Sequence, residues 1–249
     1  MSEDDLVKAG VEAALKPFAT LLERLFGGAV DEIGGIWQDA LQARRFKRRL
    51  KLLQLVQSMI EDGGYNPVEI PENVWLPSIQ QASIEDDETL QKKWAALIAN
   101  AGHPQKKIPQ TFPSILSQLT PDDAVVLDHL FFYAKGEIAR VEQEDLDISG
   151  WSLGDYKSVT ARAAKVIKTE VATVIDNLLR LRLLRVSTLP RFKIASAAEV
   201  VGRGLGTGLI GNFGDQAKED ISLTNIQYFR FSHLGVQFAM ACQPPDKSA

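Results

Sequence analysis

The sequence predicts a mainly α-helical protein of two domains, on three observations. Apolar residues recur at three- and four-residue spacing through most of the chain, which indicates amphipathic helices. A stretch with three prolines at residues 102–113 reads as a linker. Near the C-terminus, helical periodicity gives way to short β-type runs, which predicts a small β-wing. We therefore expect a helical domain over residues 1–112 and a second domain over residues 113–249.

The composition excludes several classes of protein. The 249 residues include 28 basic and 32 acidic side chains, a net charge of −4, which argues against a protein that coats nucleic acid along its length. The sequence contains no apolar run of about 18 residues that predicts a transmembrane helix, and its acidic start is unlike a secretory signal. The single cysteine, Cys242, can form no intramolecular disulfide. These features predict a cytoplasmic protein.

Four helices are predicted in the first domain, over residues 5–26, 38–62, 72–82 and 84–101. Two glycine pairs, Gly27–Gly28 and Gly34–Gly35, follow the first helix; a hinge is favoured over a flat packing stripe. Gly63–Gly64 ends the second helix as a C-cap. Ser83 is the predicted N-cap of the fourth helix. The acids at residues 85–88 then fill its first turn, where the helix dipole favours them, and they indicate solvated charge rather than a metal or acid–base site.

The second predicted helix carries the strongest local charge, in the segment 44–51. Its basic residues are candidates for binding an anionic partner: Arg44, Arg45, Lys47, Arg48, Arg49 and Lys51. Phosphates of lipid or nucleic acid would offset their mutual repulsion, as would acids elsewhere in the protein. The alternative is a solvated helix face near Asp31, Glu32 and Asp39. The preceding amphipathic segment, with Phe18, Phe26 and Trp37, gives some support to contact with a membrane surface, which would place the protein at the periphery of the inner membrane. The same apolar stripe is more commonly the core of a helical domain.

The second domain is predicted to begin at Thr120–Pro121–Asp122–Asp123, which combines an N-cap, a first-turn proline and a capping acid. The expected order is helices at 120–134, 156–166 and 169–181, strands at 183–186 and 227–232, and a closing helix at 235–242. This order is typical of a winged helix-turn-helix domain. Residues 191–225, between the strands, are rich in glycine and too long for a plain wing, so we expect a mobile insertion.

The helix at 169–181 would be the recognition helix of such a domain. Its candidate DNA contacts are Thr173, Asn177, Arg180 and Arg182. Glu170 and Asp176 on the same helix would oppose the approach of phosphate, and residues 113–249 hold 15 basic against 16 acidic side chains. Winged helices also dock proteins. A protein partner or self-association is therefore favoured over nucleic acid.

No motif in the sequence predicts catalysis, a metal or a cofactor. Residues 206–211 match G-x-G-x-x-G, but no βαβ pattern surrounds them, as a dinucleotide site requires. The three histidines have no metal-ligand spacing with one another or with Cys242, which is predicted to be a core residue. We expect a protein that is not an enzyme.

Three segments together resemble the bacterial abortive infection alpha (Abi-alpha) family: GGAVDEIGGIWQDALQARRFKRRLKLLQ, EIPENVWLPSIQQASIEDDETLQKKWAALIANA and FPSILSQLTPDDAVVLDHL. The resemblance continues through LLRLRLLRV and FSHLGVQFAMAC near the C-terminus. It implies a cytoplasmic bacterial protein of phage defence, in which an infected cell stops growing or dies before phage are released. The expected function is a non-enzymatic defence component that acts through protein or membrane-surface contacts. The alternative is a winged-helix DNA-binding transcription regulator.

Overall fold

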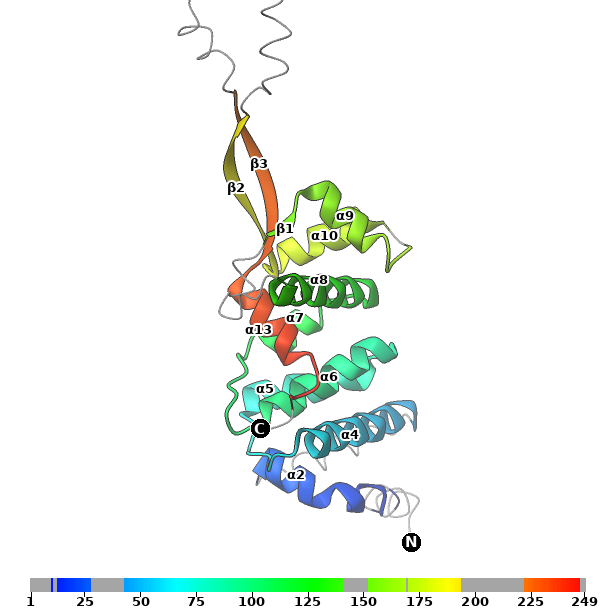
Figure 1. The fold of residues 1–249 in the computed structure, drawn as a ribbon. Helices are drawn as coiled ribbons and strands as arrows, with labels where there is room; N and C mark the ends of the chain where they lie inside the picture. The colour runs from blue at the N-terminus through cyan, green and yellow to red at the C-terminus, as the bar shows by residue number, and fades with distance from the viewer. Residues whose placement is uncertain are drawn as a thin grey trace, which may run out of the picture.

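The computed structural model describes residues 10, 13–27, 43–140, 152–168, 170–193 and 222–246 (Figure 1). Within these ranges the protein is mainly helical, with a three-stranded antiparallel sheet. In chain order the elements are η1 (Lys16–Phe18), α2 (Ala19–Phe26), α4 (Ala43–Gly63), α5 (Glu72–Ile84), α6 (Glu88–Ala101), α7 (Phe112–Leu116), α8 (Pro121–Arg140), β1 (Ser152–Gly154), α9 (Tyr156–Ala163), α10 (Val171–Arg180), β2 (Leu184–Lys193), β3 (Ser222–Phe231) and α13 (His233–Ala241).

The helices stack in layers, and the sheet lies at one end of the stack (Figure 1). α2 is at the opposite end, followed by α4, then by α5 and α6, and then by α7, α8 and α13. α9 and α10 pack against the far side of α8, next to the sheet. Because α13 contacts α6 as well as α8, the last described helix returns to an element of the first half.

The helical periodicity of the first half is confirmed in outline. α4 ends at Gly63, and Gly64 follows with a φ of 69° and donates its N–H to the Ile60 carbonyl at 3.0 Å, which is the predicted C-cap. The predicted helix at 5–26 is interrupted by the 3-10 turn η1, which contains Pro17, a residue without a backbone N–H. Residues 28–42, which include the second glycine pair, lie outside the described residues.

The junction between α5 and α6 differs from the prediction. α5 runs one residue beyond Ser83, which is buried inside the helix. The N-cap of α6 is Asp87, whose Oδ1 accepts the backbone N–H groups of Thr89 at 2.8 Å and Leu90 at 3.0 Å. The predicted cap at Ser83 is therefore wrong, because a carboxylate four residues later satisfies the first-turn amides of α6.

The start of α8 confirms the predicted capping box. Asp123 donates its backbone N–H to Oγ1 of Thr120 at 3.2 Å, and Thr120 donates both its N–H and its hydroxyl to Oδ2 of Asp123 at 2.8 Å. α8 continues to Arg140, six residues beyond the predicted end, so the polar composition after residue 134 did not end the helix.

The sheet has the strand order β1-β3-β2, with all pairs antiparallel. β2 and β3 pair along ten residues, from Leu184 opposite Phe231 to Lys193 opposite Ser222, and form a two-stranded ribbon that projects from the helices (Figure 1). Both strands were predicted in the right place but too short. Residues 191–193 and 222–225, predicted as insertion, belong to strands, whereas residues 194–221, with the glycine motif at 206–211, lie outside the described ranges. β1 was not predicted.

The core is continuous across the predicted domain boundary. Buried apolar residues from both halves form one cluster, in which Phe112 of α7 meets Phe238 of α13 edge to face at 5.3 Å, and Phe131 of α8 meets Phe231 of β3 at 6.0 Å. Trp94 of α6 is 1% exposed within the same cluster. The division at residue 112 stays a prediction, and the packing between the halves is extensive.

Buried and half-buried polar side chains join α6 to the second half of the chain, and we call them the polar clamp: Lys93, Asn100, Asp128 and Gln243. Lys93 Nζ lies 2.7 and 2.8 Å from the two carboxylate oxygens of Asp128, which also accepts Nε2 of Gln243 at 2.7 Å. Asn100 donates to the carbonyls of Ala241 at 3.0 Å and Gln243 at 2.8 Å. The clamp therefore fastens the segment after α13 to α6.

Candidate functional site

The predicted anion-binding segment forms the N-terminal part of α4, where acids of the α5–α6 junction already meet two of its cations. Arg48 donates to the Ile84 carbonyl at 3.2 Å and lies 3.6 Å from Oδ2 of Asp86. Nζ of Lys51 lies 2.8 Å from Oε1 of Glu88, and this hydrogen bond lowers the pKa of the Glu88 carboxyl. Acids elsewhere in the protein are among the partners that the sequence predicts for these cations. The structure shows such acids beside Arg48 and Lys51.

The other cations of the segment have different surroundings. Arg49 is 6% exposed, so it belongs to the buried side of α4, although the sequence makes it a candidate for binding an anionic partner. Lys47 is exposed. The side chains of Arg44 and Arg45 lie outside the part of the chain that the structure describes. A lipid or nucleic acid would therefore find less uncompensated charge here than the sequence indicates.

The run of four acids divides into two pairs. Asp87 caps α6, and Oε1 of Glu85 accepts the backbone N–H groups of Asp86 and Asp87 at 3.0 Å. The first pair, Glu85 and Asp87, therefore hydrogen-bonds to the backbone at the start of α6. Asp86 and Glu88 are the pair that faces α4. Among the described residues, no group of three or more histidine, cysteine or acidic side chains could hold a metal ion.

Two of the four predicted recognition-helix residues lie against α8. Asn177 donates Nδ2 to Oδ2 of Asp123 at 2.7 Å, the carboxylate that also completes the α8 capping box. Arg180 donates Nε and Nη2 to Oδ1 of Asn177 at 3.0 and 2.8 Å, and Nη1 to Oε1 of Gln118 at 2.9 Å. These side chains fasten α10 to the start of α8.

The other two predicted residues, Thr173 and Arg182, are exposed. Thr173 lies in the first turn of α10. Arg182 follows the helix with a φ of 58°, a left-handed conformation common just after helix ends, and its carbonyl accepts the hydroxyl of Ser232 at 2.5 Å. Whether any of the four contacts DNA stays a prediction.

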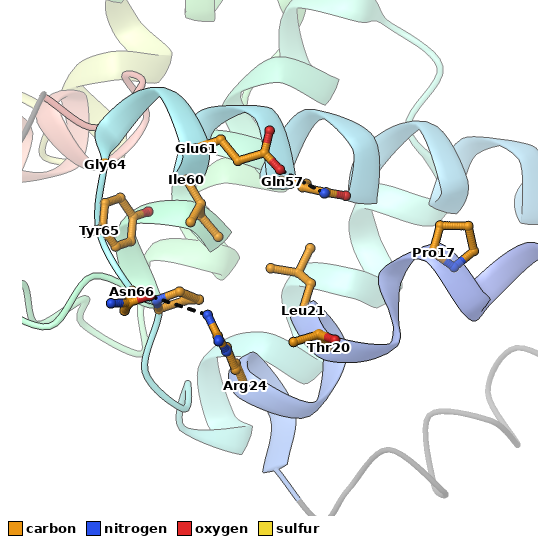
Figure 2. A pocket seen from close by; sticks show the side chains of 11 residues that line it. Pro17, Thr20, Leu21, Arg24, Gln57, Ile60, Glu61, Gly64, Tyr65 and Asn66 are labelled. Carbon is orange, nitrogen blue, oxygen red and sulfur yellow. Dashed lines mark hydrogen bonds between the residues drawn. The ribbon is translucent and has the colours of Figure 1, made fainter.

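A groove that sequence reasoning missed lies between α2 and the C-terminal part of α4 (Figure 2). It has a volume of about 360 Å³ and is open to solvent. Leu21 and Ile60 supply apolar surface, whereas Arg24 and Glu61 supply opposite charges. Nη1 of Arg24 donates to Oδ1 of Asn66 at 3.4 Å, and Gln57 donates to Glu61 at 2.8 Å. No local motif could have revealed it, because the helices that line it are separated in the sequence.

The reactive side chains near the core serve packing. Cys242 is buried, as predicted, and burial raises the pKa of its thiol to about 12, so the thiolate nucleophile is disfavoured. His103 is 7% exposed and packs on the ring of Tyr65 at 4.4 Å, and burial lowers its pKa. The hydroxyl of Tyr65 donates to the Ala99 carbonyl at 2.7 Å. In the described chain, no helix is long and apolar enough to cross a membrane.

Comparison with known protein families identifies the family of this chain. The sequence model of the family described as abortive infection alpha matches residues 42–242. The chain belongs to the Abi-alpha family. The match confirms the resemblance recognised in the sequence, and it connects this Abi-alpha protein with abortive infection, a strategy of phage defence. No curated protein and no solved structure matches it significantly.

The family match covers residues in both halves of the protein and includes Lys93, Asn100 and Asp128 of the polar clamp, whereas Gln243 lies just beyond it. It begins just before α4, so one wall of the groove, formed by η1 and α2, lies outside the matched residues. The Abi-alpha match therefore includes the basic part of α4 and all of the sheet, but only part of the groove.

Proposed function

We propose that this Abi-alpha protein is a non-catalytic component of phage defence that acts by binding another protein. The family match over residues 42–242 carries the defence part of the proposal. The non-catalytic part is supported by the burial or pairing of reactive side chains near the core. Cys242 and His103 are buried, and Lys93 and Asp128 form an ion pair between helices.

The groove between α2 and α4 is the surface that we assign to the partner. It offers apolar contacts from Leu21 and Ile60, against which a partner could pack, and a cation and an anion, Arg24 and Glu61, which could pair with charges at the rim of an interface. A lipid surface is less favoured, because Arg48 and Lys51 of the basic segment already meet acids.

The proposal predicts that expression of the protein lowers phage yield and that filling the groove removes this effect. In Thr20→Arg, a long cationic side chain enters the groove from α2 at an exposed position, so folding should be unaffected while binding is blocked. Efficiency of plating and survival of infected cells are measured for wild type, variant and empty vector across several phages.

Gln80→Arg is the matched control, since it adds the same charge at an exposed position of α5 outside the groove. It should protect like wild type. Equal plaque counts with wild type and empty vector would contradict the defence role. If Thr20→Arg protects as well as wild type, the groove is not the surface that binds the partner. If Lys47→Glu loses protection and the wild-type protein binds anionic vesicles, a membrane surface is favoured as the partner instead.

A second candidate function, DNA binding by a winged helix, is favoured by the order of elements. The order α8, β1, α9, α10, β2, β3 and the sheet order β1-β3-β2 support this candidate, because a winged helix-turn-helix domain has two wing strands after its third helix. Residues 152–193 hold nine basic and three acidic side chains. This segment is therefore basic, although the second half of the chain as a whole is nearly neutral. This surplus would attract the phosphates of a duplex.

The DNA hypothesis predicts salt-dependent binding that weakens when exposed cations before α10 are removed. Lys165→Gln with Lys168→Gln should reduce affinity for a 20-base-pair duplex. The negative slope of the logarithm of the association constant against the logarithm of the salt concentration should also become less steep by about 2, because each lysine would neutralise one phosphate. Fluorescence anisotropy at several salt concentrations measures both. Lys16→Gln with Lys47→Gln, two exposed lysines of the first half, is the control. If both double variants bind alike, this surface does not contact DNA.

A further inference from the structure

The strand β2 has an edge with which no described strand pairs. In the sheet order β1-β3-β2, β2 pairs with β3 on one side, and its other side has no partner strand within the described chain. The ribbon of β2 and β3 projects from the helices (Figure 1). Thr188 is exposed, and Val186 is 42% exposed. A free strand edge presents unpaired N–H and C=O groups, to which another strand can add.

The hydrogen bonds between β2 and β3 decide which backbone groups point to this edge. Ser232 donates its N–H to the carbonyl of Leu183 at 3.0 Å, and the two residues stand opposite each other in the register of the strands. Hydrogen-bonded and non-hydrogen-bonded positions alternate along an antiparallel pair. Because the register continues without a shift, Leu184, Val186 and Thr188 take non-hydrogen-bonded positions. Their N–H and C=O groups therefore point away from β3, toward the free edge.

Pro190 limits the length of this edge. It is the next residue of β2 whose backbone groups point outward in this register. Proline has no backbone N–H, and within sheets it is tolerated only where no further strand pairs with that side. A strand that adds to β2 must therefore stop before Pro190, which leaves the five residues 184–188.

We propose that this stretch pairs with the same stretch of a second copy of the chain, antiparallel and centred on Val186. Outward-pointing residues of one copy must stand opposite outward-pointing residues of the other. Among the registers that also keep Pro190 off the second strand, the one centred on Val186 aligns the most residues. It sets Leu184 opposite Thr188 and forms about six backbone hydrogen bonds. The sheet would then continue as β1-β3-β2-β2-β3-β1.

A second copy fits this edge because the stretch is complementary to itself. The exposed Val186 would be covered by Val186 of the other copy, and pairs of β-branched residues suit a sheet. Arg185 would stand opposite Ser187, so no like charges face each other. Two strands of this length bury less area than the 1,200–2,000 Å² or so of a standard interface, so the dimer should dissociate at low protein concentration. The groove is not involved, so the dimer is independent of the proposed function.

Sedimentation velocity of the full chain over a range of concentrations tests for the dimer. The wild-type protein should shift from monomer to dimer as its concentration rises. Val186→Pro, or separately Thr188→Pro, removes an outward N–H in both copies and leaves the bonds to β3 in place. Each variant should raise the dissociation constant by about tenfold or more. Circular dichroism and the thermal midpoint check that the variants fold, and Thr188→Pro keeps the test open if Val186→Pro does not.

Gln227→Pro is the matched control. Gln227 of β3 stands opposite Thr188, is exposed, and has its N–H on the other side of the ribbon, beyond the residues that pair with β1. The substitution therefore removes an outward N–H from the wrong edge, and the variant should dimerise like wild type.

Two cysteine variants test the register. Residues that stand opposite in a hydrogen-bonded pair have Cα atoms about 5.5 Å apart, which suits a disulfide. Val186→Cys should therefore cross-link two copies on mild oxidation. Thr188→Cys should not, because its two copies would lie about 13 Å apart along the strands. Cys242 is buried, so the wild-type protein should give no cross-linked dimer.

Three results would overturn the proposal. A wild-type protein that stays monomeric at every concentration would exclude a second copy and leave the edge to a strand of another protein. A dimer that Val186→Pro and Thr188→Pro leave intact, or that Gln227→Pro weakens equally, would not use this edge. Cross-linking of Thr188→Cys in place of Val186→Cys would exclude the register centred on Val186.

Discussion

Replacing Asp128 with alanine is expected to lower the free energy of unfolding by about 3 kcal/mol. The reason is the position of Lys93, which is 4% exposed and has its Nζ 2.7 Å from the Asp128 carboxylate. Removal of the carboxylate would leave a buried ammonium group without its counter-charge. We place the effect at the lower end of the range for buried pairs because the Asp128 side chain is 28% exposed. Urea denaturation measures the change.

The double variant Lys93→Met with Asp128→Ala is the control. It removes both charges and keeps an apolar side chain in the buried position, so it should recover most of the stability that Asp128→Ala loses. A double variant less stable than Asp128→Ala would show that the ion pair is not the source of the loss. Because the pair joins α6 to α8, we also expect both halves to unfold in one transition; two separate transitions would favour the predicted domain division.

Replacing Gly235 with alanine is expected to destabilise the protein by about 3 kcal/mol, the upper part of the range for overpacking. A Cβ atom at this position of α13 would overlap the backbone carbonyl of Leu183. That carbonyl accepts the N–H of Ser232 at 3.0 Å, and Ser232 caps α13 through the Gly235 N–H at 2.8 Å, so neither side can move without loss of a hydrogen bond. The midpoint of thermal unfolding reports the change.

Gly136→Ala is the matched substitution and should have the opposite effect. Gly136 lies within α8 at an exposed position, and an added Cβ would meet nothing within 4 Å. Alanine is favoured over glycine inside helices, so stability should rise by about 0.5–1 kcal/mol. If Gly235→Ala proves as stable as Gly136→Ala, the close approach of α13 to Leu183 does not constrain the fold.

Local sequence signals predicted the existence and type of most described elements. The capping box at Thr120–Asp123 and the C-cap at Gly64 depend on residues within four positions of each other, so one sequence suffices to recognise them. The order of helices and strands after residue 120 follows from the change in apolar period from 3.6 to 2.

Signals that compete locally led to errors. Ser83 and Asp87 are both residue types that cap helix N-termini. Ser83 is buried within α5, which extends to Ile84, so Asp87 is the residue that caps α6. The strands β2 and β3 extend beyond their apolar centres because each supplies the hydrogen-bond partners of the other along ten residues. The three-residue strand β1 has too few residues to show a period.

The candidate sites were predicted only in part. The basic segment was recognised by its charge, but the pairing of Arg48 with Asp86 and of Lys51 with Glu88 joins residues 37–38 positions apart. The roles of Asn177 and Arg180 in holding α10 to α8, and the opposition of Arg185 and Arg230, likewise depend on helix packing and strand register.

The helical class, the capping box at Thr120–Asp123, the C-cap at Gly64, the family and the place of the two long strands follow from the sequence alone, because they depend on periodicity and on neighbouring residues. Which charges face one another is set by the packing of the layers. It set Lys93 against Asp128, the Leu183 carbonyl against Gly235, and Arg185 opposite Arg230. The physical reason is that burial and electrostatic interaction depend on distance in space, and these partners are brought together only when the layers pack.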